Sequence, residues 1–128
     1  MILVQRQARP HPHLDKLKAL GGAILLALSD DLRKPQYRGH PNRLKGHCYV
    51  ASEALYHLAG GQASGLKPMN VRHEDDQHWF LADEDGRIYD LTADQFSTPV
   101  PYNLARGRGF LTRQPSLRAQ IVIQRVTK

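Results

Sequence analysis

Apolar residues recur at spacings of three and four between Leu14 and Leu32, and this period predicts an amphipathic helix with one face toward a core. A glycine pair, Gly21–Gly22, lies inside the stretch, and we expect it to let a neighbouring element approach closely. A second run, from His47 to Ala59, is apolar on most sides and has the composition of a buried helix. The pair Gly60–Gly61 follows this run and provides a C-terminal stop.

Three short segments beyond the second helix have the composition of strands, namely Met69–Arg72, His78–Ala82 and Arg87–Leu91. The last two flank Asp85–Gly86, a dipeptide typical of hairpin turns. We therefore expect these two strands to pair with each other. A short helical turn, Thr92–Phe96, is expected to follow them.

The two ends of the chain are less regular than its middle. Met1–Gln7 reads either as a short strand or as a loose arm, inside a lead-in of residues 1–12 that contains two prolines. The stretch Pro99–Thr112 is expected to be irregular. Ser116–Val126 is predicted to form a terminal helix capped by its first residue, although the β-branched run Ile121–Ile123 leaves a strand open.

The order of these elements predicts one α+β domain over residues 1–128, in which helices pack on a small antiparallel sheet. A content of 41% hydrophobic and 23% charged residues excludes a mainly disordered chain. The longest apolar stretch, Ala19–Leu28, is too short to cross a membrane, and we expect neither a membrane span nor a signal peptide. Cys48 is the only cysteine, which excludes an intrachain disulfide and favours a reducing, cytoplasmic location.

The net charge of +6 is unevenly distributed along the chain. Residues 1–64 carry 9 basic and 4 acidic residues, residues 65–94 carry 3 and 8, and residues 95–128 carry 6 and none. Such a pattern either attracts polyanions or reflects charge pairing within the molecule. We expect an acidic protein or peptide as partner, with nucleic acid as the second choice. The candidate partner-binding residues are Arg38, Arg43 and Lys45 in the basic loop Arg33–Gly46, together with Arg106 and Arg108.

The candidate chemistry starts from Cys48, which is expected in the first turn of the second helix with Gly46 as a tolerable N-cap. Unpaired N–H groups and the helix dipole favour an anion there, and a thiol attacks carbonyl groups only as its thiolate. His78 begins a rigid strand, and Asp90 lies on the next strand as an acceptor for its imidazole. A three-residue hairpin loop, Glu84–Gly86, would make these two residues diagonal neighbours on one face, whereas a two-residue loop would separate them.

Simpler interpretations exist for each of these residues. A lone cysteine in a helix is most often a small buried hydrophobe. His78 can end a strand, and Asp90 can bond to the backbone near Thr92. Structural zinc usually takes four ligands, often in paired spacings, and one cysteine among scattered histidines does not provide them. We therefore expect no metal and no cofactor.

The segment Gly46–Leu55 resembles the nucleophile helix of the transglutaminase-like, papain-like cysteine superfamily, in which a Gly-x-Cys-aromatic pattern begins a buried helix. The stretch His78–Phe80 followed by Asp85–Thr92 resembles the His strand, Asp-Gly turn and Asp strand of that superfamily, in the same order. The resemblance implies a transglutaminase-like or papain-like core. It also implies three catalytic roles, with Cys48 as nucleophile, His78 as general base and acid, and Asp90 as the orienting carboxylate.

Acyl transfer also needs hydrogen-bond donors for a developing oxyanion. The backbone N–H of Cys48 is one candidate. Asn42 is similar in placement to the side-chain amide donor of papain-like enzymes, and its alternative is an ordinary turn residue after Pro41. The sequence thus favours a thiol-dependent enzyme that hydrolyses an amide, peptide or isopeptide bond or transfers the acyl group to an amine. The alternatives are a non-catalytic basic binding or inhibitor protein on the same fold and a nucleic-acid-binding module.

Overall fold

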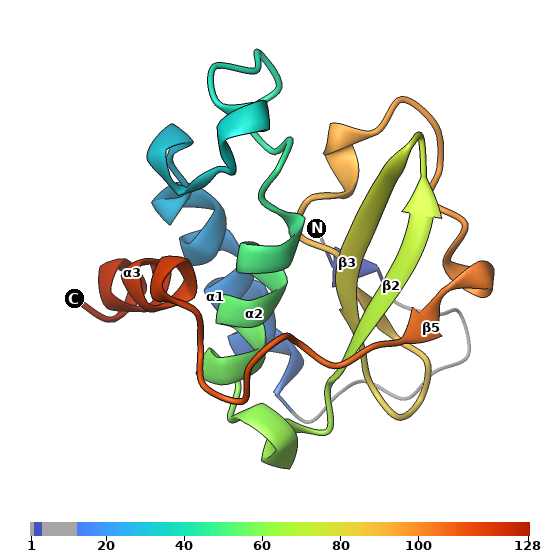
Figure 1. The fold of residues 1–128 in the computed structure, drawn as a ribbon. Coiled ribbons are helices and arrows are strands. Elements are labelled where there is room, and N and C mark those ends of the chain that lie inside the picture. Colours follow the sequence, from blue (N-terminus) through green and yellow to red (C-terminus); the bar gives the residue numbers. More distant parts are fainter. Residues whose placement is uncertain (1, 4–12) are drawn as a thin grey trace.

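A computed structural model describes residues 2–3 and 13–128 of the chain (Figure 1). The helices α1 (Leu14–Ala27), α2 (Cys48–Leu58) and α3 (Leu117–Thr127) gather on one side of an antiparallel sheet, which confirms the predicted α+β class. The described sheet has the strand order β1-β4-β3-β2-β5. Its strands are β1 (Ile2–Leu3), β2 (Lys67–His73), β3 (Asp76–Ala82), β4 (Ile88–Tyr89) and β5 (Arg106–Gly107).

Helix α2 is the centre of the packing, because it lies against β3 and against both other helices (Figure 1). Its buried face includes Ala54 and Leu55, whose side chains are fully excluded from solvent. The helix begins at Cys48 with His47 as its N-cap residue, so the expected N-cap at Gly46 is wrong. Gly46 instead has a φ of +85°, and a Cβ there would lie 2.7 Å from the ring of Tyr37. The glycine is thus required by the loop that leads into the helix.

Helix α1 ends at Ala27, five residues before the predicted end, and a 3-10 turn covers Asp30–Leu32. Leu28 adopts an extended conformation and stops the helix. The guanidinium of Arg43 donates to the carbonyls of Leu25 at 2.6 Å and Leu28 at 3.0 Å. These contacts satisfy acceptors that a helix end leaves open, so a distant side chain supports a boundary that local periodicity does not reveal.

Of the glycine pair in α1, Gly21 has the predicted packing role, whereas a Cβ at Gly22 would meet nothing within 4 Å. A Cβ at Gly21 would lie 2.7 Å from a methyl group of Leu91, so the helix backbone approaches the chain after β4 closely. Leu91 and Tyr89 belong to the same buried cluster as the apolar faces of the helices. The apolar face of the β3–β4 hairpin therefore faces α1 and α2.

The terminal element is a helix, as predicted. The hydroxyl oxygen of Ser116 accepts from the N–H of Ala119 at 3.2 Å and caps α3. The buried carboxylate of Glu53 on α2 in turn accepts from the N–H and the hydroxyl of Ser116, both at 2.7 Å. This link fixes the start of α3 against α2.

The β3–β4 hairpin has the three-residue loop on which the candidate site depends. Leu81 pairs with Tyr89, and the N–H of Asp83 donates to the carbonyl of Arg87 at 3.0 Å. Gly86 closes the loop with a φ of +82°. The structure thus contains the three-residue loop of the two alternatives, and alternate residues of β3 face opposite sides of the sheet.

The β2–β3 connection was not foreseen. Strand β2 is longer than the predicted Met69–Arg72 and joins β3 through Glu74 and Asp75, whose φ angles are +49° and +66°. Neither residue is glycine, so the usual hairpin signal is missing. The carboxylate of Glu74 accepts from the backbone N–H groups of Ser97 and Thr98, which compensates for the unusual turn.

The connecting segments contain further short elements, among them 3-10 turns at Pro35–Tyr37 and Gly61–Ser64. The short turn after β4 is a 3-10 helix over Ala93–Gln95, and the stretch Pro99–Thr112 contains both a 3-10 turn, Tyr102–Leu104, and β5. At the N-terminus, β1 confirms a short strand, while the remainder of the predicted arm lies outside the described residues. None of the described helices combines the length and the apolar content needed to cross a membrane.

Candidate functional site

Cys48 occupies the first position of α2 and is half-buried. The first hydrogen bond of the helix runs from Ala51 N–H to the carbonyl of His47 at 2.9 Å. The N–H of Cys48 therefore precedes the bonded turns, where the helix dipole favours negative charge. The thiol lies 3.6 Å from the carbonyl oxygen of Gln77, at the beginning of β3. Helix and strand thus bring the sulfur to one end of the sheet.

His78 and Asp90 form a buried pair, and both side chains are fully excluded from solvent. His78 Nε2 lies 2.7 Å from Asp90 Oδ2. The contact follows from the hairpin register, because two residues separated diagonally across paired strands can touch on one face. The structure thus brings together the His and the Asp that the sequence singled out.

The imidazole of His78 also interacts with Cys48. Burial lowers the pKa of His78, but the bonded carboxylate of Asp90 and the neighbouring Cys48 outweigh burial and raise the pKa to about 9. Because Nε2 is occupied by the carboxylate, Nδ1 is the ring atom that remains for the thiol. Nδ1 is buried and makes no standard hydrogen bond with any described residue. Cys48 is thus close enough to influence the imidazole, whose other side is held by the carboxylate.

Tyr102 is a member of this cluster that the sequence reasoning missed. Its hydroxyl donates to Asp90 Oδ2 at 2.8 Å, the same oxygen that faces His78. Burial, followed by the charge of Asp90, raises the pKa of Tyr102, which keeps the phenol protonated as a donor. The N–H of Thr92 reaches the other oxygen, Oδ1, at 3.3 Å. No local signal pointed to Tyr102, because it lies in a stretch that reads as irregular.

Aromatic rings enclose the imidazole. Phe96 contacts His78 edge-on with ring centroids 4.8 Å apart, and Phe80 stacks against it at 5.9 Å. Tyr102 meets Phe80 edge-on at 5.0 Å. This apolar wall limits the access of water to the His–Asp pair and strengthens its electrostatic interaction.

A small cavity of about 80 Å³ opens beside the thiol. Asp76 is its only acidic lining residue, and it is bonded to Lys45 and to the hydroxyl of Tyr37, the latter at 3.0 Å. Burial and the bond to Asp76 raise the pKa of Tyr37. The cavity is lined by Lys34, Tyr37, Gly46, Cys48, Tyr49, Asp76, Trp79, Gln95 and Arg118.

The side chain of Asn42 has the turn role that was its alternative interpretation. Asn42 Oδ1 accepts from the N–H of Leu44 at 3.0 Å, and its amide nitrogen donates to the carbonyl of Gln95 at 3.4 Å. Asn42 does not line the cavity beside Cys48. The geometry therefore gives the expected oxyanion role of Asn42 no support and leaves the Cys48 N–H as the candidate donor.

The basic loop is held from within by Arg33, which is 4% exposed. Its guanidinium donates to the carbonyls of Tyr37, His40, Asn42 and Arg43 at distances from 2.8 to 3.1 Å. In the sequence Arg33 looks like one of several surface charges. In the structure it is a buried cross-link between backbone carbonyls of the loop. The loop that borders the thiol is thereby fixed in shape.

The five predicted partner-binding residues divide into two groups. Lys45 pairs with Asp76, whereas Arg38 and Arg43 are exposed and donate to backbone carbonyls. Arg106 and Arg108 are exposed on and just after β5. They line a separate groove and do not line the Cys48 cavity. The five residues thus do not share one cavity, and their role in partner binding stays a prediction.

The side chain of His47, the residue before Cys48, is directed toward the preceding loops. This side chain is fully buried, and its two ring nitrogens lie 3.0 Å from the carbonyl oxygens of Arg43 and Ser29. Burial lowers the pKa of His47. Its role is to tie the start of α2 to the preceding loops.

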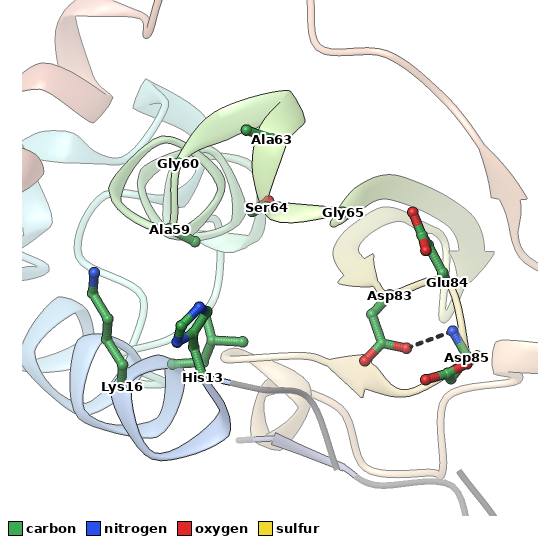
Figure 2. A pocket seen from close by; sticks show the side chains of 11 residues that line it. His13, Lys16, Ala59, Gly60, Ala63, Ser64, Gly65, Asp83, Glu84 and Asp85 are labelled. Atoms are coloured by element: carbon green, nitrogen blue, oxygen red, sulfur yellow. Dashed lines mark hydrogen bonds between the residues drawn. The ribbon is translucent and has the colours of Figure 1, made fainter. Parts of the chain in front are cut away.

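A larger cavity of about 440 Å³ lies between the beginning of α1, the end of α2 and the β3–β4 loop (Figure 2). It shares no lining residue with the Cys48 cavity. Asp83, one of its acidic lining residues, accepts from the N–H of Asp85 at 3.0 Å and is also bonded to Arg87 and Tyr89. No group of three or more metal-ligating side chains occurs among the described residues, so this acidic loop offers no cation site.

Comparison with known proteins gives no relative for the chain. A scan of family models finds no match, and neither the curated proteins nor the solved structures contain a significant match. The functional interpretation therefore depends on the geometry.

Proposed function

We propose that this chain is a thiol-dependent acyl-transfer enzyme in which Cys48 is the nucleophile, His78 the general base and acid, and Asp90 the orienting carboxylate. The observation that carries the proposal is the buried imidazole that contacts Asp90 through Nε2 at 2.7 Å and also interacts with Cys48. The resemblance to the transglutaminase-like, papain-like superfamily points to the same roles. A papain-like or transglutaminase-like core is part of this proposal.

In the proposed reaction the sulfur of Cys48 attacks the carbonyl carbon of an amide, and a carbon–sulfur bond forms. His78, already protonated, donates its proton to the leaving nitrogen as the carbon–nitrogen bond breaks, and a thioester remains. Water or an amine then attacks the thioester carbon and gives a proton to His78, and the carbon–sulfur bond breaks. The acyl product leaves, and the Cys48 thiolate and protonated His78 are restored. The N–H of Cys48 at the start of α2 is suited to stabilise the oxyanion.

We propose a protein or peptide amide, or an isopeptide, as the substrate. The thiol is half-buried beside a cavity of about 80 Å³, which suits a narrow acyl group on a larger partner. A single thiolate nucleophile works best where thiols stay reduced, so a cytoplasmic location belongs to the same proposal.

The test uses the fact that Cys48 is the only cysteine, so alkylation reports on one atom. Iodoacetamide labelling of the native protein near pH 7 is followed by mass spectrometry. His78→Ala is expected to slow labelling at least about tenfold, since a positioned base typically contributes that much or more. His40→Ala is the matched control, because His40 is an exposed loop residue outside the triad, and its labelling rate should equal that of the wild type.

Equal labelling rates for His78→Ala and His40→Ala, with both proteins folded by circular dichroism, would overturn the proposal. So would a thiol that reacts only after unfolding. Incubation with a p-nitrophenyl ester gives the complementary measurement. It should leave an acyl group on Cys48 that hydroxylamine removes, as a thioester requires.

A non-catalytic binding protein is the second candidate, and the exposed Arg106 on β5 and Arg108 just after it favour this alternative. An unreactive thiol together with tight binding of a partner would support that alternative.

A further inference from the structure

A groove of about 370 Å³ lies along the β2–β5 edge of the sheet, on residues that the proposed reaction does not use. Arg72, on β2, was not among the residues singled out from sequence, and it joins Arg106 and Arg108 there. The groove is lined by Asn70, Val71, Arg72, Leu104, Arg106, Gly107 and Arg108.

Strand register explains why the three arginines gather. Asn70 pairs with Arg106 on β5 and with Trp79 on β3, so these three side chains share one face of the sheet. Arg72 and Arg108 follow Asn70 and Arg106 by two residues and point to the same face. The N–H of Arg108 donates to the carbonyl of Pro68 at 3.1 Å, which extends the β5 ladder through this position.

The positive charge of the groove is not compensated within the described residues. Arg72, Arg106 and Arg108 are exposed and form no ion pair there. This contrasts with Arg87, which pairs with the buried carboxylate of Asp83. The charges of the groove are thus free for a ligand from outside.

The groove is connected to the candidate active site through one side chain. The guanidinium of Arg108 lies over the ring of Trp79, 5.7 Å from its centroid, and Trp79 lines the cavity beside Cys48. A chain that lies along the groove would therefore reach the thiol end of the sheet.

We propose that the β2–β5 groove binds an acidic, extended segment of a polypeptide, with carboxylates paired to Arg72, Arg106 and Arg108. Arg–carboxylate pairs can be bidentate, and three of them define a direction along the strand. Leu104, which is 67% exposed, offers contact for an apolar side chain of the same segment. That this segment belongs to the substrate rests on the proposed function.

A polypeptide fits this groove better than a nucleic acid does. Single-stranded nucleic acids bind through bases that stack on aromatic rings, and the groove lining contains none. Trp79, the nearby ring, is only 9% exposed and is covered by Arg108.

The test measures binding by Cys48→Ser protein, so that no covalent step contributes. Fluorescence anisotropy at 150 mM salt compares a Glu-rich peptide, its Gln-substituted counterpart and oligo-dT of similar length. The acidic peptide should bind at least tenfold more tightly than the other two. Arg72→Ala combined with Arg106→Ala should weaken its binding at least tenfold.

The control variant is Arg113→Ala combined with Lys128→Ala, which removes the same two charges from exposed positions outside the groove. Equal loss in both double variants would show a general charge effect and overturn the proposal. Tighter binding of oligo-dT than of the acidic peptide would overturn it in favour of nucleic acid. Because alkylation of Cys48 is measured separately, failure of the groove leaves the proposed thiol chemistry intact, and the reverse also holds.

Discussion

The β3–β4 hairpin holds two buried aspartates in nearly the same chemical setting, one at each end. Asp83 accepts from the guanidinium of Arg87 and from the hydroxyl of Tyr89 at 2.9 Å. Asp90 meets the imidazole of His78 and accepts from a tyrosine hydroxyl, that of Tyr102, at 2.8 Å. Each carboxylate thus has a cationic partner, a phenol and at least one backbone donor.

The two clusters differ in whether the cation can exchange its proton. A guanidinium stays protonated throughout the physiological range, so the Asp83 cluster can only hold the hairpin loop together. An imidazole can gain and lose a proton, and that of His78 in the Asp90 cluster is influenced by the thiol of Cys48. A buried carboxylate is therefore a poor indicator of function by itself, and the titratable neighbour is what distinguishes the two ends.

The largest expected effect is on stability at the Asp83 end. Asp83→Ala leaves the fully buried guanidinium of Arg87 without its carboxylate, and breaking a buried pair typically costs about 3–5 kcal/mol. Urea denaturation followed by circular dichroism should show this loss. The labelling rate of Cys48 in the folded fraction should stay near the wild-type value, because the cluster lies at the other end of the hairpin.

A loss below about 1 kcal/mol for Asp83→Ala would mean that water or a rearranged loop replaces the carboxylate. A parallel collapse of thiol reactivity in the folded fraction would contradict the division between the two clusters.

At the Asp90 end we expect a smaller change in stability and a larger change in chemistry. Asp90→Asn keeps the shape but removes the charge that holds His78 protonated, so Cys48 labelling should fall about ten- to a hundredfold. The stability cost should be about 2 kcal/mol, as for a hydrogen bond to a charged group.

The same variant tests the pH dependence of stability. The folded pKa of His78, about 9, lies above its ordinary value of 6.5, so protonation stabilises the fold. This contribution is fully present below about pH 6.5 and is lost as the pH rises through about 9. Urea titrations across this window should show the decline in the wild type and a weaker decline in Asp90→Asn. Identical pH profiles would show that the carboxylate does not control the imidazole.

Many of the elements and contacts in this comparison could be predicted from the sequence, because they depend on local rules. The period of α1, the Asp85–Gly86 turn and the cap at Ser116 each predicted the element that the structure contains. The juxtaposition of His78 and Asp90 follows from the three-residue loop, one of the two loops that the sequence left open. Contacts between residues close in sequence obey short-range geometry and can be derived from it.

Contacts between distant segments were not predictable in this way. Tyr102 reaches Asp90 from a loop, and Arg33 cross-links four backbone carbonyls. Arg43 donates to carbonyls at the end of α1, fifteen or more residues earlier in the chain. Each of these side chains reads as an ordinary surface residue in the sequence. Their roles depend on tertiary packing, which overrides composition at a single position.

The smallest expected effect comes from Tyr102→Phe. The variant removes only the hydroxyl that donates to Asp90 and keeps the ring against Phe80, so the stability loss should be about 1 kcal/mol. With one donor fewer, the carboxylate should attract the imidazolium more strongly, and the pKa of His78 should rise. A pH titration of the His78 ring signals by NMR measures the shift, with labelling kept within a few-fold of the wild type. An unchanged titration would show that Tyr102 is only a packing residue, and a labelling loss as large as that of Asp90→Asn would place it among the groups on which the thiol depends directly.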